Sequence, residues 1–376
     1  MKPNNALQVL YDERLVGTLA MTADHKAAFQ YSEEWLEHGF PISPFSLPLK
    51  RQVFVPNKDY FDGLFGVFAD SLPDNWGRLL LKRLLRAHGQ NPDKLTVLER
   101  LAIVGKSGMG ALTYYPEKEM QEKQGHSNLD ELAEQCRKIL NTEYSDRLDE
   151  LYRLGGTSGG ASPKIMTTVN GEEWIIKFPA HVDGENAGKM EYDYSCCAKK
   201  CGIIMSETRL FPSENCEGYF GIKRFDRISD KNGTKRIHML TAAALLELNF
   251  EQPSLDYHSL MKLTKILTRD NEKDMREMFR RMCFNVFAHN RDDHSKNFTY
   301  LYDDEKDRWS LSPAYDLTYS NTYYGEHTTT VDGNGRNPGR KELLTVGIAA
   351  GMKKEVCIES MDMVEKCVKN MLGRYL

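Results

Sequence analysis

Residues 290 to 316, which read NRDDHSKNFTYLYDDEKDRWSLSPAYD, contain the polar side chains whose types and spacing best suit a chemical role. Asp292 is followed by Asn297, and Asp316 comes after a further apolar and turn-forming stretch. In phosphoryl transfer, one carboxylate handles the proton of the acceptor hydroxyl, while an amide oxygen and a second carboxylate hold Mg²⁺. The three residues fit that set. The alternative interpretation is a polar loop with Asx turns on an ordinary surface hairpin.

The pattern around these residues predicts how they are positioned. Apolar residues recur at helical spacing over 274–289, which predicts a helix before the polar cluster. Alternating residues over 298–302 and a short apolar return over 309–311 predict a β-hairpin after it. A hairpin brings its open ends together, so Asn297 and Asp316 are expected to face one small volume with Asp292 nearby.

A second candidate site lies at residues 155–179, GGTSGGASPKIMTTVNGEEWIIKFP. A loop of glycine and small hydroxyl residues precedes a hairpin, whose turn is predicted at Asn170-Gly171. Such a loop can place backbone N–H groups against phosphate oxygens, because glycine permits a close approach. Lys164 and Lys177 would add positive charge beside those oxygens. The alternative is a connector before an ordinary hairpin.

Two further segments fit a nucleotide site. Glu191 lies in a helical pattern and could pair with Lys177, as a helix glutamate does with the strand lysine of kinases. It could equally be an acidic residue in the first turn of a helix. Residues 219–227 predict a buried strand that leads to a charged connector. In a two-lobed nucleotide enzyme such a strand ends at the hinge, where backbone groups meet the adenine.

Composition limits the class of protein. The chain has 376 residues, of which 28% are charged and 40% apolar, enough for two domains or lobes of a globular protein. The net charge of −4 excludes a general attraction to nucleic acid, so DNA contact would need a local patch or a partner. No signal peptide and no 18-residue apolar run is found. The eight cysteines therefore predict reduced thiols in the cytoplasm.

Two apparent motifs are rejected. Gly105-Lys106-Ser107 suggests a P-loop, but that motif needs a glycine at position 100, which is Arg100. The cysteines at 196, 197 and 201 lack zinc-site spacing and a nearby histidine, so we predict no metal there. Strands are predicted over 6–21, 27–31 and 111–115, and a linker over 116–128. Predicted helices cover residues 33–38, 61–69, 76–87, 129–140, 146–154, 236–248, 259–268, 340–349 and 359–372.

The order of these segments resembles the HipA family, the toxin-type serine/threonine kinases of bacterial toxin–antitoxin modules. The resemblance covers nearly the whole chain. Its N-terminal part lies in LVGTLAM, FQYSEEWL, PISPFSLPL, FADSLPDNWGR and VGKSGMGAL. Its C-terminal part lies in GGTSGGASPK, IIKFP, MEYDYS, GIKRFDR, NRDDHSKNF and LSPAYDL. No single motif is specific, whereas the N-x-D-x-H-x-x-N pattern followed by P-x-Y-D is specific in combination with the others.

The resemblance implies an α+β, two-lobed kinase-like fold with a β-rich N-terminal lobe, an added N-terminal segment and a mainly helical C-terminal lobe. The domains expected on that basis are an N-terminal subdomain (1–120), a linker and helix (121–150), the nucleotide-binding part of the N-terminal lobe (151–230) and the helical lobe with the catalytic and metal-binding loops (231–376).

The resemblance also implies roles for individual residues. Asp292 and His294 are the catalytic residues: Asp292 engages the acceptor hydroxyl, and His294 lies close to the phosphates or the metal shell. Asn297 and Asp316 hold Mg²⁺. Autophosphorylation of the Gly/Ser loop is expected at Thr157 or the adjacent Ser158; relatives more often have serine at position 157. Ser162 stands where relatives often have arginine or glutamine. The ATP-binding positions implied are Thr157, Ser158, Gly159, Gly160, Ala161, Ser162, Lys164, Lys177, Lys223, Arg224, Phe225 and His294.

The function implied is an ATP- and Mg²⁺-dependent kinase of protein serine or threonine hydroxyls, switched off when its own loop is phosphorylated. A small helix-turn-helix antitoxin is the implied partner, with DNA contacted only through it and no membrane. Two alternatives stay open. The chain could be a non-catalytic, antitoxin-binding co-regulator of transcription, or a small-molecule phosphotransferase. The exposed basic side chains predicted over 76–87 give either a solvated face or a docking surface for an acidic partner.

Overall fold

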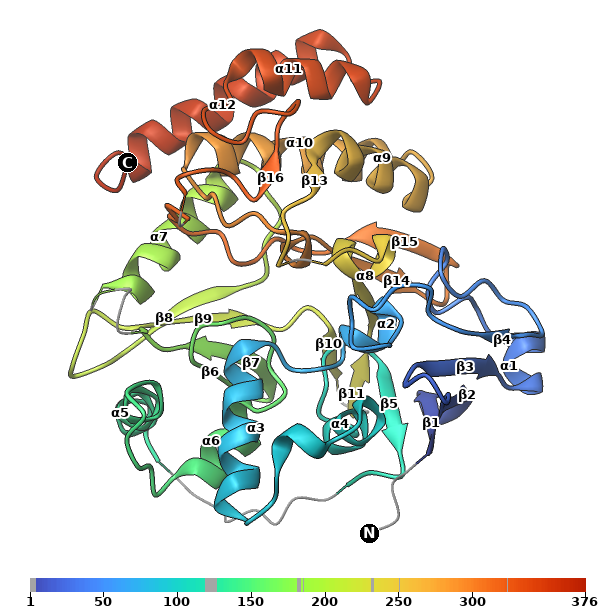
Figure 1. The fold of residues 1–376 in the computed structure, drawn as a ribbon. Coiled ribbons are helices and arrows are strands. Elements are labelled where there is room, and N and C mark those ends of the chain that lie inside the picture. Colours follow the sequence, from blue (N-terminus) through green and yellow to red (C-terminus); the bar gives the residue numbers. More distant parts are fainter. Residues whose placement is uncertain are drawn as a thin grey trace. The chain divides into compact units, whose positions relative to one another are not determined.

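The computed structural model describes residues 5–118, 127–180, 184, 186–230, 233–249, 251–322 and 324–376. The chain forms two compact units (Figure 1). Unit 1 comprises Met1–Asn186, Phe211–Leu240 and Ala244–Glu247, and unit 2 comprises Ala187–Leu210, Thr241–Ala243 and Leu248–Leu376. The linker predicted for 116–128 falls mostly outside the described residues. Among the described helices, none is both long and apolar enough to cross a membrane.

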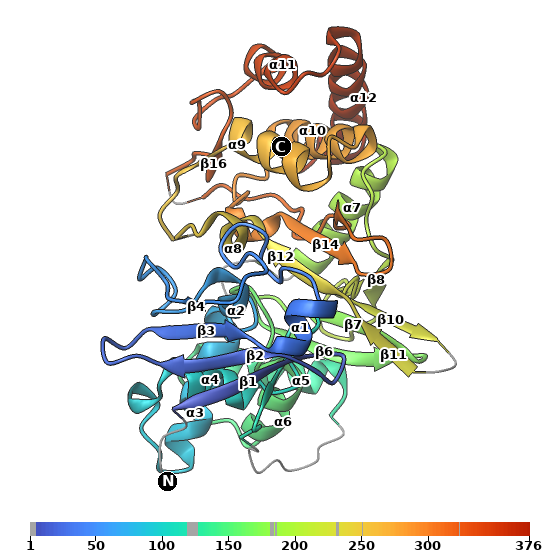
Figure 2. The same cartoon turned by 90° about the vertical axis from the view of Figure 1, so that its right-hand side faces the viewer.

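Unit 1 begins with an antiparallel sheet in the order β4-β3-β2-β1-β5 (Figure 2). The predicted hairpin over 6–21 is confirmed, and both residues of its turn, Asp12 and Glu13, have positive φ, as a tight hairpin turn requires. Helix α4 packs against strands β1, β2 and β5, and most of its apolar residues are buried. The strands are β1 (Ala6–Tyr11), β2 (Arg14–Met21), β3 (Ala27–Tyr31), β4 (Val53–Phe54) and β5 (Leu112–Tyr115).

The Gly/Ser loop of unit 1 joins a helix to a second sheet, in which β7 pairs with β6 and with β9. The β6–β7 turn is Asn170-Gly171, with φ of 52° and 80°, as the sequence predicts. A core of side chains from α3, α5, α6 and these strands lies beneath the loop, with Trp76 and Leu151 at most 1% exposed. The paired strands are β6 (Lys164–Val169), β7 (Glu172–Lys177) and β9 (Tyr219–Lys223). A separate two-stranded sheet consists of β10 (Arg227–Asp230) and β11 (Gly233–Arg236).

The helices of unit 1 largely agree with prediction. Each of α4 and α5 begins with a reciprocal capping box, formed by Thr96 with Glu99 and by Asn128 with Glu131. The helices are α1 (Glu33–His38), α2 (Gly66–Ala69), α3 (Asn75–Ala87), η1 (Pro92–Lys94), α4 (Val97–Val104), α5 (Leu129–Leu140) and α6 (Leu148–Gly155).

Unit 2 is mainly helical. Helix α10 is buried along most of its length and packs against α9 and α12, while α12 also contacts α7 and α11 (Figure 1). The predicted hairpin is present as β14 and β15, paired from Tyr300 with Leu311 to Asp303 with Arg308. Its elements are α7 (Ala187–Lys200), β13 (Leu255–Asp256), α9 (Tyr257–Leu267), α10 (Glu272–Phe287), η2 (Ser295–Asn297), β14 (Thr299–Asp303), β15 (Arg308–Leu311), β16 (Thr329–Thr330), α11 (Arg340–Ala349) and α12 (Lys354–Leu372).

Two predicted helices are wrong. The segment 236–248 contains a strand, β12 (His238–Thr241), followed by a short helix, α8 (Ala242–Leu246). His238 and Leu240 are buried and Met239 is half-buried, which is the alternation of a strand, and this spacing was interpreted as helical. The predicted helix over 61–69 is reduced to α2, because Asp62 and Gly63 both have positive φ and cannot continue a right-handed helix. Strand β8 (Thr208–Phe211) lies where the chain passes from unit 2 into unit 1.

Gly77 lets helix α3 approach the Gly/Ser loop. A Cβ at this position would lie 2.5 Å from the Gly156 carbonyl oxygen and 2.6 Å from Pro73 Cβ. Gly77→Ala should therefore lower the free energy of unfolding by ~1–3 kcal/mol, although alanine in a helix normally raises it by ~0.5–1 kcal/mol. Denaturant unfolding gives the free energy of unfolding and so distinguishes a stabilised from a destabilised variant. The control is Arg78→Ala, an exposed neighbour expected to change stability by less than ~0.5 kcal/mol. A stabilised Gly77→Ala would contradict the close approach.

Candidate active site

The polar loop of unit 2 follows the C-terminus of α10 directly. The helix ends at Phe287, and His289 takes a positive φ of 53°, which turns the chain out of the helix. Asn290 then bridges to Ser320, and the Arg291 amide donates to the Ser320 carbonyl at 3.3 Å. The segment after the hairpin, around residue 320, therefore runs beside the loop that precedes the hairpin. This brings together the two predicted clusters of polar residues.

Asp292, His294 and Asn297 form one compact turn. The Asn297 side-chain amide donates to the Asp292 carbonyl at 2.7 Å, and the Asn297 backbone amide donates to the His294 carbonyl at 2.9 Å. His294 caps the short helix η2, with its ring Nδ1 accepting from the Lys296 amide at 3.3 Å. The bond from Asn297 Nδ2 assigns its amide orientation and directs Oδ1 away from the loop backbone.

Asp316 is joined to the same loop through Asn290, whose side-chain amide lies 3.5 Å from the Asp316 carbonyl oxygen. Asp316 has a φ of 52°, a left-handed conformation that most side chains adopt only at a free-energy penalty. The preceding Tyr315 holds this position, because its hydroxyl donates to the Lys296 carbonyl at 2.5 Å and bonds Thr299 at 2.6 Å. Strain of this kind persists where the surroundings fix it and often marks functional sites.

The electrostatics of the loop set Asp292 apart from an ordinary surface aspartate. Although the residue is exposed overall, protein atoms surround its carboxyl group, and this partial desolvation raises its pKa. The charges of Asp316 and Asp293 raise the pKa of Asp292 further, while His294 lowers it. A carboxyl with a raised pKa suits a group that accepts a proton near neutral pH.

The residues of this loop fit a hard divalent cation. Asn297 Oδ1 and the Asp316 carboxylate are the oxygen donors that Mg²⁺ prefers, and Mg²⁺ usually binds one or two protein groups together with waters and phosphate oxygens. Within the described residues, no group of three or more His, Cys, Asp or Glu side chains is arranged to hold a metal by itself. A cation here would thus require further oxygen ligands from a phosphorylated substrate.

Asp293, next to the candidate base, is a functional residue that the sequence analysis missed. Its carboxylate is completely buried and accepts from the Tyr257 hydroxyl at 2.8 Å and the Thr329 amide at 3.1 Å, with His327 Nδ1 at 3.1 Å. Asn285 extends this network by donating to the Tyr257 hydroxyl at 2.8 Å. Asp293 therefore anchors the loop from behind, while Asp292 faces outward. Only the doubled aspartate in the sequence hinted at two roles.

The Gly/Ser loop of unit 1 lies closed and largely buried. Thr157 is 7% exposed and Ser158 1% exposed; the Ser158 hydroxyl donates to the Gly155 carbonyl at 2.6 Å. Gly160 adopts a φ of 85°, which turns the loop back toward β6. Lys164 Nζ donates to the Gly159 carbonyl at 2.7 Å, so this lysine crosses beneath the loop. Ala161 is exposed and Ser162 is half-buried.

Of the strand residues predicted at the nucleotide site, Lys164 and Lys177 are neighbours, whereas Lys223 lies opposite Trp174, nearer the β6–β7 turn. Lys177 is the register partner of Lys164, and its ammonium lies 5.7 Å from the centre of the Phe220 ring. The Lys223 ammonium pairs with Glu172, also within the sheet. The structure thus brings the loop and both lysines of the hairpin to one end of the β6–β7–β9 sheet.

The other predicted hinge residues differ in their environments. Arg224 directs its guanidinium into the protein, where it bonds both carboxylate oxygens of Asp226 at 2.9 and 2.8 Å. Arg224 would therefore contact a nucleotide with its backbone rather than its side chain. Phe225 is half-buried. Glu191 is buried on α7 of unit 2, and its pairing with Lys177 of unit 1 stays a prediction.

Two family models match most of the chain. The family model described as "HipA N-terminal domain" matches residues 7–115, and that described as "HipA-like C-terminal domain" matches residues 156–371. Two proteins of Sinorhizobium fredii that are named as candidate kinases are similar. Y4mE is 26% identical over 351 residues, covering 84% of this chain and 78% of Y4mE. Y4dM is 24% identical over 339 residues, covering 86% of this chain and 79% of Y4dM.

A solved structure has a similar fold to this chain. It is the Shewanella oneidensis HipA in a complex with HipB and operator DNA, at a TM-score of 0.72 and 17% identity, covering 98% of this chain and 90% of that chain. The predicted α+β, kinase-like fold class is thereby confirmed.

The two neighbouring aspartates should respond oppositely to truncation. Asp293→Ala leaves the Tyr257 hydroxyl, the His327 ring and the Thr329 amide without their buried acceptor, so the free energy of unfolding should fall by ~3–5 kcal/mol. Asp292→Ala removes a carboxylate that burial and Asp316 disfavour, so stability should stay unchanged or rise slightly. Denaturant unfolding of both variants at neutral pH checks the contrast, and equal losses would contradict the assignment of Asp293 as the anchor.

Proposed function

This chain belongs to the HipA family, and we propose that it is an ATP- and Mg²⁺-dependent protein kinase that phosphorylates serine or threonine hydroxyls. One observation carries the proposal. Asp292 and Asn297 share one turn to which Asn290 joins Asp316, the pKa of the Asp292 carboxyl is raised, and the oxygen donors suit Mg²⁺. A protein that only bound a partner would need none of these features.

The proposed division of labour follows from the positions of the groups. Asp292 accepts the proton of the acceptor hydroxyl at its carboxylate. Asn297 and Asp316 would hold Mg²⁺, which when bound supplies positive charge to the phosphate oxygens. Lys177 and the backbone amides of the Gly/Ser loop would bind the phosphates of ATP. In the overall reaction the acceptor O–H bond breaks, its oxygen bonds to phosphorus, ADP leaves and the proton goes to Asp292.

A partner protein is also proposed. The solved HipA neighbour is in a complex with HipB and operator DNA, and the present chain shares its fold over 98% of its length. We infer that the chain binds a small helix-turn-helix antitoxin, and that DNA is contacted through this partner. The net charge of −4 supports indirect contact, because the chain has no general attraction to the DNA backbone.

The kinase proposal is tested with Asp292→Asn, which keeps the size of the side chain and removes its charge. Phosphoryl transfer to a Ser/Thr protein substrate should fall at least ~10²-fold, since the proton acceptor is lost, while ATP binding by calorimetry persists. In the unmodified protein kcat/KM should fall on acidification from a higher pH than an ordinary aspartate would give, because the pKa of Asp292 is raised and its carboxylate form is required.

Asp270→Asn, an exposed aspartate of the same unit, is the control and should keep full activity. Normal turnover by Asp292→Asn would overturn the assignment. Intact ATP binding without turnover in the unmodified protein would favour a non-catalytic co-regulator, and transfer only to small alcohols would favour a small-molecule phosphotransferase.

Self-inhibition is the second consequence. Incubation with ATP and Mg²⁺ should place one phosphate on Thr157 or Ser158, seen by intact mass and peptide mapping and absent from Asp292→Asn. The phosphate adds about −1.5 to −2 charge to a loop that would bind other phosphates, so ATP affinity should fall. Both hydroxyls are buried in the closed loop, so modification requires the loop to open. Undiminished ATP affinity of the phosphorylated protein would contradict this model.

A further inference from the structure

The Gly/Ser loop is held by residues far away in the sequence, all within unit 1. The Gly160 amide donates to Asp74 Oδ2 at 2.8 Å, and the Gly160 carbonyl accepts from the Trp76 amide at 3.3 Å. The Trp76 indole Nε1 donates to the Lys164 carbonyl at 3.1 Å. The start of helix α3 thus contacts the tip of the loop and its exit into β6. Asp74 and Trp76 have no role in the chemistry proposed above.

Asp74 uses its carboxylate on the loop instead of on its own helix. It is the N-cap residue of α3, where an aspartate normally accepts from an amide of the first turn. Its side chain makes no such cap hydrogen bond. It accepts from Gly160 instead, and a Cβ on Gly159 would lie 3.4 Å from the same oxygen. A charged acceptor on a backbone N–H is among the stronger hydrogen bonds, so this contact is a main restraint on the loop.

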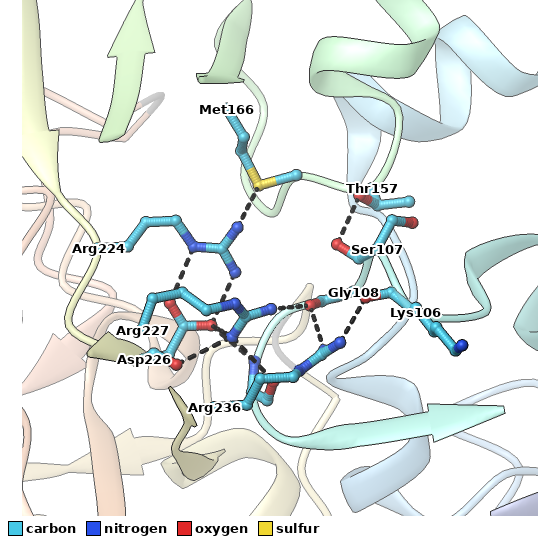
Figure 3. Close-up of polar contacts among 10 residues, drawn as sticks. Lys106, Ser107, Gly108, Thr157, Met166, Arg224, Asp226, Arg227 and Arg236 are labelled. Atoms are coloured by element: carbon cyan, nitrogen blue, oxygen red, sulfur yellow. Dashed lines mark hydrogen bonds and ion pairs between the residues drawn. The ribbon is translucent and has the colours of Figure 1, made fainter. Parts of the chain in front are cut away.

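A second restraint acts on the other side of the loop. The Thr157 hydroxyl donates to the Ser107 carbonyl at 3.1 Å (Figure 3). Ser107 belongs to the turn 105–110, the Gly-rich segment that is not a P-loop. The Ser158 hydroxyl, in contrast, donates to the Gly155 carbonyl, which lies in the helix before the loop. Thr157 is therefore the hydroxyl that connects the loop to another part of unit 1.

The turn 105–110 is a rigid acceptor because two arginines brace its carbonyl groups (Figure 3). Arg227 donates to the Gly108 carbonyl at 2.8 Å and the Gly110 carbonyl at 3.0 Å. Arg236 donates to the same two carbonyls, each at 2.9 Å, and also to that of Lys106. The buried Asp226 carboxylate accepts from the Gly110 amide at 2.8 Å. The backbone of the turn is thus fixed on both sides of Ser107.

We propose that Asp74 and the turn 105–110 form a clamp that holds the Gly/Ser loop closed, and that Asp74 is a positioning residue for nucleotide binding. The clamp closes through Gly160 on one side and through the Thr157 hydroxyl on the other. Its effect on nucleotide affinity rests on the function proposed above, whereas its effect on loop position does not. The region matched by the N-terminal family model then acts directly on the loop that the C-terminal model begins with.

The experiment is hydrogen exchange of the loop amides over 156–164, followed by mass spectrometry in nucleotide-free protein. All variants carry Asp292→Asn, so no autophosphorylation intervenes. Asp74→Ala should speed exchange of these amides about tenfold, because a charge-assisted bond is lost. Asp74→Asn should restore part of the protection, since its Oδ1 still accepts from Gly160. Asp93→Ala, an exposed aspartate of the same region, should leave loop exchange unchanged.

The hydroxyl side of the clamp is tested in the same assay. Thr157→Val keeps the shape of the side chain but cannot donate to Ser107, so loop exchange should speed up several-fold. Ser158→Ala removes a hydroxyl that bonds within the preceding helix and should change loop exchange less. Amides of β7, which lie in the adjacent sheet, report global unfolding and should exchange alike in all variants. Equal loop exchange in Asp74→Ala and in the parent protein that carries only Asp292→Asn would overturn the clamp. Equal effects of Thr157→Val and Ser158→Ala would overturn it as well.

The nucleotide arm separates this inference from the proposed function. The Kd for ATP should rise about tenfold in Asp74→Ala, in parallel with loop exchange, and stay unchanged in Asp93→Ala. Faster loop exchange with an unchanged Kd would overturn Asp74 as a positioning residue. Faster loop exchange in a protein that never binds ATP, with or without the substitution, would support the clamp on the loop and overturn the proposed kinase function instead.

Discussion

The buried carboxylate of Asp293 is the interaction on which the candidate catalytic loop depends. A carboxylate without solvent must be satisfied by protein donors, or burial becomes prohibitive. Tyr257, His327 and Thr329 supply these donors from α9 and from the segment beyond the hairpin. The loop is consequently tied to two other parts of unit 2 at its centre. This anchor fixes the positions of Asp292 and His294 on either side, and their own side chains take no part in it.

Unit 1 also contains a buried aspartate, but its main partners are charged arginines. The Asp226 carboxylate is fully buried, and its pKa is lowered to about 2, because the attraction of Arg224 and Arg227 outweighs desolvation. Arg227 also holds the turn 105–110 through backbone carbonyls, together with Arg236. One buried carboxylate therefore organises both the strand that leaves the sheet at Lys223 and the turn that contacts Thr157. Interior ion pairs of this kind need not add stability, but they do fix geometry.

The sequence was informative where function and local pattern coincide. Asp292 and Asn297 lie five residues apart on one turn, and the Asn170-Gly171 dipeptide specifies its own backbone conformation. It was uninformative where contacts join distant segments. His327 lies 34 residues from Asp293, and Asp74 lies 86 residues from Gly160, and no local periodicity connects either pair. The strand at His238 differs from the prediction because Leu240, Ala243 and Leu246 recur at helical spacing, and this pattern favoured a helix over the whole segment.

The contact between Thr157 and the turn has a consequence for how this protein can vary. The acceptor is the main-chain oxygen of Ser107, and the arginines also bind main-chain oxygens. Side chains in the turn thus carry little of the information that defines the contact, and position 107 should tolerate many residue types. The exceptions are Gly105 and Gly110, whose φ values are 50° and 71°, and the Gly110 amide also donates to Asp226. Substitutions in this segment would leave the contact with Thr157 intact as long as the backbone keeps its conformation.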